Sequence, residues 1–138
     1  MKNFRDWGLP LGRRFRALKL WFLIREQGVL GLQARLRRDL ANAQWLDVQI
    51  RAAANWRVLA PVPLQTLCVR HEPVGLEGDA LDRHTLGWVE RVNRSGAAYL
   101  TPAMLDGRWM VRVSIGAEPT ESAHVEALWT TMQMEAEQ

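Results

Sequence analysis

The sequence predicts an α/β protein of the α+β type, with an antiparallel sheet of about four strands and helices packed on one face. Two observations predict this class. The chain has 138 residues, 48% of them hydrophobic and 24% charged, which is the balance of one globular domain with its own core. Two helical segments are followed by two strands, a helix, two strands and a last helix, an order that suits such a sheet.

The first third of the chain is predicted to be a loop followed by two helices. Residues 1–12 are rich in glycine and proline and are expected to form an irregular leading loop. Residues 13–27 have a helical pattern that ends at Gly28, a residue suited to a helix C-terminus. Residues 29–54 place leucine and alanine at intervals of three and four, which predicts a second helix with one apolar face and one arginine-rich face.

The first of these helices is apolar nearly all round. Between residues 17 and 24 only Lys19 is polar. A helix of this kind is buried on more than one side, whereas a chain this short offers one core to bury it in. We therefore expect its outer side to contact a partner that is not in this sequence.

Two strands are predicted next, over residues 56–60 and 65–70. Pro61 and Pro63 lie between them, and because proline cannot donate a hydrogen bond to a strand ladder, they mark the connection. The seven tryptophans of the chain are expected to be core or interface anchors rather than a stacking platform for bases.

A third helix is predicted over residues 79–94, with Asp79 as its N-cap, Asp82 in its first turn and Gly96 past its end.

The last part of the chain is predicted to be a β-hairpin and a helix. The hairpin strands are residues 97–102 and 108–115, joined at Asp106-Gly107, a pair that suits a turn with positive φ at both positions. Thr120 is expected to cap the last helix, residues 121–134.

Positive charge is concentrated at the N-terminus. Residues 1–38 hold ten Lys or Arg against two acids, whereas residues 39–138 hold eight Arg against thirteen acids. A basic arm can contact nucleic acid, an anionic ligand or an acidic protein surface, and composition does not choose among them. No basic and aromatic repeat accompanies Arg35, Arg37 and Arg38, so nucleic-acid binding is not favoured over a solvated or partner-facing surface.

The loop at residues 8–12 runs into a helix start that carries Arg13, Arg14 and Arg16. Free N–H groups and arginines at a helix N-terminus attract anions such as phosphate. The loop lacks both phosphate-loop fingerprints, so local physics favours an ordinary helix start over an anion site.

No metal site is expected. Among the three histidines, His71, His84 and His124, none belongs to a motif with metal-ligand spacing. The nearest approach to a metal cluster is Cys68 with His71 and Glu72, which does not define a closed site.

The sequence predicts a cytoplasmic protein. Its only cysteine, Cys68, cannot form an internal disulfide. No apolar run reaches the roughly 18 to 20 residues of a membrane span, and the basic start is not followed by the apolar core and cleavage site of a signal peptide.

Several motifs run through the chain in order. The first is Arg5-Asp6-Trp7, followed by the run PLGRRFRALKLWF over residues 10–22. Further matches are VNRSG over residues 92–96 and LDGR over residues 105–108. Together they resemble the aromatic-amino-acid decarboxylase family, the group II pyridoxal-dependent decarboxylases, over essentially the whole chain.

This resemblance implies the small C-terminal domain, here residues 13–138, of a fold-type-I enzyme that works as an obligate homodimer. In that family a lysine holds pyridoxal phosphate as a Schiff base, assisted by two histidines and an aspartate. All of these precede the motif that begins this chain, and neither Lys2 nor Lys19 matches the Schiff-base lysine. The resemblance thus implies that the large pyridoxal-phosphate-binding domain is absent and that no catalytic residue is present. Leu11 and Gly12 would reach the partner's cofactor pocket across the dimer.

The leading interpretation is a C-terminal piece of a decarboxylase, either an isolated domain or a truncated gene product. The parent would convert an aromatic L-amino acid to its amine and CO₂, and this piece would supply dimer and domain-closure contacts while being inactive alone. One alternative is a non-enzymatic module that binds nucleic acid or an anionic partner through the basic arm. Another is a regulatory protein that docks on an intact decarboxylase by mimicking its C-terminal domain.

Overall fold

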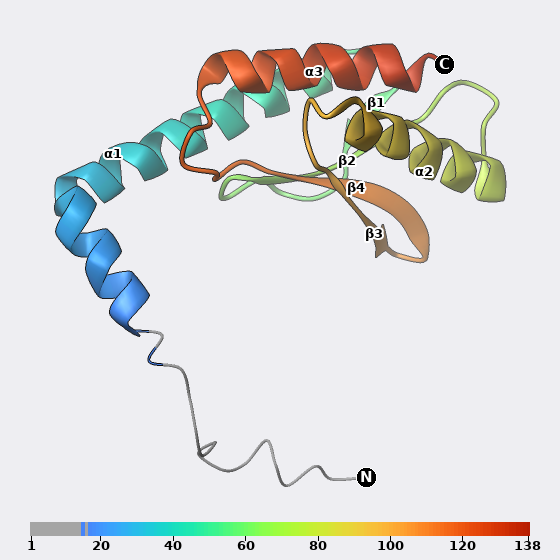
Figure 1. Ribbon diagram of the computed structural model, residues 1–138. Coiled ribbons are helices and arrows are strands. Elements are labelled where there is room, and N and C mark those ends of the chain that lie inside the picture. The colour runs from blue at the N-terminus through green and yellow to red at the C-terminus, as the bar shows by residue number, and fades with distance from the viewer. Residues whose placement is uncertain (1–14, 16) are drawn as a thin grey trace, which may run out of the picture. The chain divides into compact units, whose positions relative to one another are not determined.

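The computed structural model describes residue 15 and residues 17–138, so the leading loop with Leu11 and Gly12 lies outside the described residues. The chain divides into two compact units, with the boundary after Ala34. This boundary falls inside α1 (Ala17–Ala52), a helix that contributes to both units (Figure 1).

In the first unit, α1 is interrupted at Gly28. Its φ of 65° and ψ of 174° are not helical, and two helical segments meet there at a kink. The positive φ suits glycine because it has no Cβ. The predicted helix end at Gly28 is confirmed.

The second unit is built on a four-stranded antiparallel sheet. Its strands are β1 (Trp56–Val58), β2 (Thr66–His71), β3 (Thr101–Leu105) and β4 (Arg108–Ser114). They are arranged in the order β1-β2-β4-β3, and every pair of neighbours is antiparallel. The predicted sheet of about four antiparallel strands is confirmed.

Helices cover one face of this sheet. They are α2 (Gly78–Ser95), α3 (Ser122–Ala136) and the part of α1 that follows residue 34 (Figure 1). Alternate residues of the two central strands point toward these helices and are buried, because successive strand side chains face opposite sides. The buried core is formed mainly by Ala43, Leu46, Ile50, Trp56, Leu67, Val69, Trp88, Val92, Val111, Val113, Val125, Trp129 and Met132.

The hairpin was placed correctly at its turn but not at its first strand. Asp106 and Gly107 have φ values of 50° and 75°, as the predicted turn requires. The first strand lies at residues 101–105 rather than 97–102, because a two-residue turn brings the strands together directly beside it.

A side chain from α2 holds the segment before β3. Asn93 donates from Nδ2 to the Leu100 carbonyl at 2.9 Å and accepts from the Leu100 N–H at 2.6 Å. This pair of bonds satisfies the backbone of a buried residue outside the sheet, so residues 97–100 form a connection and not a strand.

Replacing Asn93 with alanine is expected to destabilise the fold by about 2 kcal/mol, because the Leu100 N–H and carbonyl would be left buried without partners. Urea denaturation followed by circular dichroism measures the change. Glu90→Ala is the matched control, since its exposed ion pair with Arg94 on the same helix is worth well under about 1 kcal/mol. Equal stability of the two variants would show that the Asn93 bonds are unimportant.

Both predicted N-caps are wrong. The N-cap of α2 is Glu77, and that of α3 is Glu121, which forms a reciprocal capping box with His124. Asp82 instead accepts a hydrogen bond from the Trp109 N–H at 3.1 Å, which ties α2 to β4. The predicted C-cap of α2, Gly96, is confirmed by its left-handed φ of 76°.

Candidate functional site

The first unit presents a continuous set of apolar side chains on its helix. Trp21 and Phe22 are 54% and 58% exposed, and their rings meet edge to face at 5.1 Å. The exposed large apolar residues of this unit, which we call the α1 apolar surface, are Phe15, Leu18, Leu20, Trp21, Phe22, Ile24, Val29 and Leu30. Contiguous apolar surface of this kind marks an interaction site on a folded protein. The expectation that this helix has apolar surface to offer a partner agrees with these exposures.

Two arginines of the predicted basic tract form hydrogen bonds within the chain. Arg35 donates to the Gly116 carbonyl at 2.8 Å. Arg38 donates to the Glu118 carbonyl and to the Glu121 carboxylate, both at 2.9 Å. These bonds hold the connection between β4 and α3, while the Arg38 side chain stays 31% exposed. They do not test the prediction of a solvated or partner-facing surface. Arg13, Arg14 and Arg16 lie outside the described residues.

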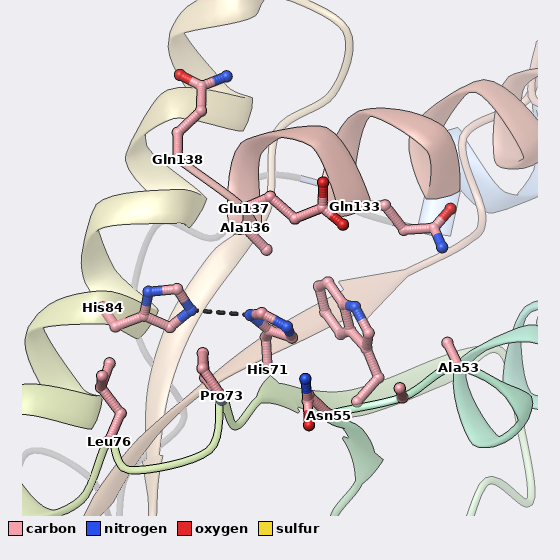
Figure 2. A pocket seen from close by; sticks show the side chains of 12 residues that line it. Ala53, Asn55, His71, Pro73, Leu76, His84, Gln133, Ala136, Glu137 and Gln138 are labelled. Atoms are coloured by element: carbon pink, nitrogen blue, oxygen red, sulfur yellow. Dashed lines mark hydrogen bonds between the residues drawn. The ribbon is translucent and has the colours of Figure 1, made fainter.

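A hollow of about 590 Å³ opens where β1, β2, α2 and the end of α3 come together (Figure 2). Asn55, Trp56, His71, His84 and Glu137 are among the residues that line it. Aromatic rings, amides and one carboxylate therefore share a single opening to solvent.

The central feature of this hollow is a pair of histidines. Nδ1 of His71 lies 2.9 Å from Nε2 of His84, so one ring donates a hydrogen bond to the other (Figure 2). His71 is the inward-facing last residue of β2, and the ring of Trp56 packs against it at 4.9 Å between centroids. Trp56 in turn packs against Trp88 of α2, four residues after His84.

Burial lowers the pKa of both histidines. Desolvation is the main cause that lowers the pKa of His71, and the neighbouring His84 lowers this pKa further, while Glu137 acts in the opposite direction. Desolvation, followed by the charge of Arg91, also lowers the pKa of His84. Two neutral imidazoles can share a hydrogen bond, whereas two imidazolium ions repel each other.

The grouping of Cys68, His71 and Glu72 considered from sequence is not brought together as a site. Cys68 lies three residues before His71 on the same strand and therefore faces the opposite side of the sheet. Glu72 accepts hydrogen bonds from Arg70 at 2.7 Å and from Arg57 at 3.3 Å. Within residue 15 and residues 17–138, no three His, Cys, Asp or Glu side chains are grouped so that they could hold a metal ion.

The described residues do not form a site for pyridoxal phosphate by themselves. Such a site needs a lysine for the Schiff base and a partner for the pyridinium nitrogen. Lys19 is the single lysine of the described part of the chain, and it is exposed on α1. The hollow beside His71 has no lysine in its lining.

Among the described helices, none is both long enough and apolar enough to cross a membrane.

Comparison with known proteins identifies the family. Residues 1–72 match the pyridoxal-dependent decarboxylase conserved domain. Tryptophan decarboxylase TDC1 of Camptotheca acuminata is 34% identical over 131 residues, which cover 92% of this chain and 26% of the relative. Tryptophan decarboxylase 2 of Oryza sativa subsp. japonica is 33% identical over 134 residues, which cover 97% of this chain and 27% of the relative. The chain thus spans about a quarter of the length of these curated relatives.

Solved structures agree with the sequence matches. The structure of Oryza sativa TDC with PLP and tryptamine superposes on 98% of this chain with a TM-score of 0.83 and 28% identity, and the match covers 29% of that structure. Rhodiola rosea 4-hydroxyphenylacetaldehyde synthase superposes on 99% of this chain, and 29% of its own, with a TM-score of 0.81 and 31% identity. The fold is therefore the one found in these enzymes. The family model and the superpositions together show that this chain belongs to the pyridoxal-phosphate-dependent group II decarboxylase family.

Proposed function

We propose that this chain acts as the small domain of an aromatic-L-amino-acid decarboxylase, together with a pyridoxal-phosphate-binding domain, and that it is inactive without that domain. One observation carries the proposal: nearly the whole chain superposes on Catharanthus roseus tryptophan decarboxylase, yet it matches less than a third of the length of that enzyme. The lysine content of the described residues supports it, because Lys19 is exposed and does not line the hollow beside His71.

In this proposal residues 13–138 are the small domain and residues 1–12 are the leading loop. The partners are the cofactor-binding domain and a second copy of the enzyme in a homodimer, in the cytoplasm. Leu11 and Gly12 approach the cofactor pocket of the second copy. This role for the loop rests on the family motif at residues 5–22.

The α1 apolar surface would be covered by the cofactor-binding domain and the dimer partner. Its exposed Trp21 and Phe22 are the residue types that carry most binding energy in protein interfaces. When bound, pyridoxal phosphate supplies an electron sink for the carbanion left by loss of CO₂. This chain contributes the packing that holds the two domains and two copies together.

The substrate proposed is an aromatic L-amino acid. Relatives in this family are named as tryptophan and tyrosine decarboxylases. A phenylacetaldehyde synthase of Arabidopsis thaliana is also 32% identical to this chain. Proteins with different named reactions therefore share this domain, so membership of the family does not by itself fix the reaction.

A grafting experiment tests the proposal. The matched quarter of Oryza sativa tryptophan decarboxylase 2 is replaced with residues 1–138, and the host without its own segment is the control. We expect the graft to be a soluble dimer that binds pyridoxal phosphate and releases CO₂ from L-tryptophan, and the control to do neither. We also expect the chain alone to release no CO₂.

A graft that folds and dimerises but releases no CO₂ would contradict the proposal. If the graft failed while the separate chain co-purified with the intact relative, the chain would instead be a docking protein.

A further inference from the structure

The His71–His84 pair is independent of the decarboxylase function proposed above. It lies in the hollow of the second unit, and each ring is held on a different element, His71 at the end of β2 and His84 within α2. The contacts of Trp56 with His71 and of Trp56 with Trp88 and Trp129 keep the strand side of the pair in place. The two imidazoles are tilted by 45° to each other, and the packed aromatic residues hold the His71 side of the pair.

The separation of the two ring nitrogens matches that of two ligands on one metal ion. Metal to nitrogen distances of about 2.0 to 2.1 Å place two adjacent ligands about 2.8 to 3.0 Å apart at a right angle, and about 3.3 to 3.4 Å apart in a tetrahedron. The observed distance from His71 Nδ1 to His84 Nε2 is 2.9 Å. To hold an ion in either geometry the nitrogens need to separate by less than about half an ångström, and the rings need to turn so that both lone pairs point at the ion and not at each other.

The chemistry of the pair also suits a metal ion. Each neutral imidazole can offer the facing nitrogen as a ligand while the outer nitrogen, Nε2 of His71 or Nδ1 of His84, carries the proton. Binding therefore needs a change of tautomer in one ring. Imidazole nitrogen is a good ligand for zinc, copper and nickel and a poor one for calcium or magnesium.

Charges of both signs lie near the pair. Glu137 lines the same hollow and contributes negative charge. Arg91, the cation that acts on His84, forms an ion pair with the Glu135 carboxylate at 3.3 Å, which offsets its charge. The hollow is open to solvent, so water can fill the remaining coordination positions.

We propose that His71 and His84 form a binding site for a divalent transition-metal ion of the nickel, copper and zinc group, with water completing the coordination. The two histidines come together only in the folded second unit. Binding should therefore stabilise the fold in proportion to the logarithm of metal concentration above the dissociation constant.

The test is a titration of the full chain, without a histidine tag, with Ni²⁺, Zn²⁺ or Cu²⁺ at neutral pH. We expect one ion per chain and an electron paramagnetic resonance spectrum of the Cu²⁺ form that shows two nitrogen ligands. His84→Gln is expected to weaken binding at least tenfold. His84 is half-buried, so this variant should keep its fold, which circular dichroism checks. His124→Gln is the matched control, because His124 lies in the capping box of α3 and should leave binding unchanged.

Binding equal to that of the unaltered chain in both His71→Gln and His84→Gln would overturn the proposal. Absence of binding by all three ions would overturn it as well and would leave the pair a purely structural hydrogen bond. Neither result would bear on the decarboxylase function, which the grafting experiment decides separately.

Discussion

Replacing both Leu20 and Phe22 with glutamate is expected to convert a self-associating chain into a monodisperse monomer. Both side chains are 58% exposed on the α1 apolar surface. Isolated in water, this surface would associate with other copies, because burying apolar area contributes roughly 25 cal/mol per Å². Glutamate is a good helix former, so the exposed substitutions should leave the helix intact. Size-exclusion chromatography with light scattering measures the change in mass.

Val74→Glu is the matched control for this prediction. Val74 is 93% exposed but lies in the loop before α2, in the second unit, and is not part of the α1 apolar surface. Its replacement should leave the association unchanged. If the unaltered chain were monomeric at all concentrations, the α1 apolar surface would not be the interface that the proposed function requires.

Local signals accounted for most of the fold. Asp106-Gly107 predicted the hairpin turn because few residue pairs tolerate positive φ at both positions. Gly28 and Gly96 marked helix ends for the same conformational reason. The prediction was wrong where a side-chain hydrogen bond determines the backbone conformation. The Asn93 side chain bonds to the backbone of Leu100, seven residues later, so residues 97–100 do not join β3.

The interaction surface was predictable and the histidine pair was not. The apolar character of the first helix is visible in its sequence, because a run with Lys19 as its one polar residue has no solvated face. His71 and His84 are thirteen residues apart on a strand and a helix. A signal was present in each element, since His71 continues the inward alternation of Leu67 and Val69, and His84 lies one turn before the buried Trp88. Nothing local indicated that the two buried faces meet.

The hydrogen bonds that Arg35 and Arg38 form within the chain could not be predicted either. Their acceptors lie more than seventy-five residues away, in the connection before α3. Charge composition does not show which charges form bonds within the fold, so it left open a contact with nucleic acid, an anionic ligand or an acidic protein surface. Arg35 and Arg38 form hydrogen bonds within the chain.

The metal-free chain is expected to lose stability as the pH falls below about 6.5, the value for an unperturbed histidine. The pKa values of His71 and His84 are lowered in the folded state, mainly by burial. Between the lowered folded values and the unfolded value, the unfolded chain binds more protons, so acid favours unfolding. Each proton taken up on unfolding contributes about 1.4 kcal/mol per pH unit within that window.

Urea denaturation in the presence of a chelator, at a series of pH values from neutral down to about 5, measures this dependence around the histidine pKa. Replacing His84 with glutamine should flatten it, because that variant has one fewer titrating ring and His71 no longer faces a second charge. A dependence that is the same in the unaltered chain and in His84→Gln would mean that carboxylates, and not this histidine pair, control the acid stability of this domain.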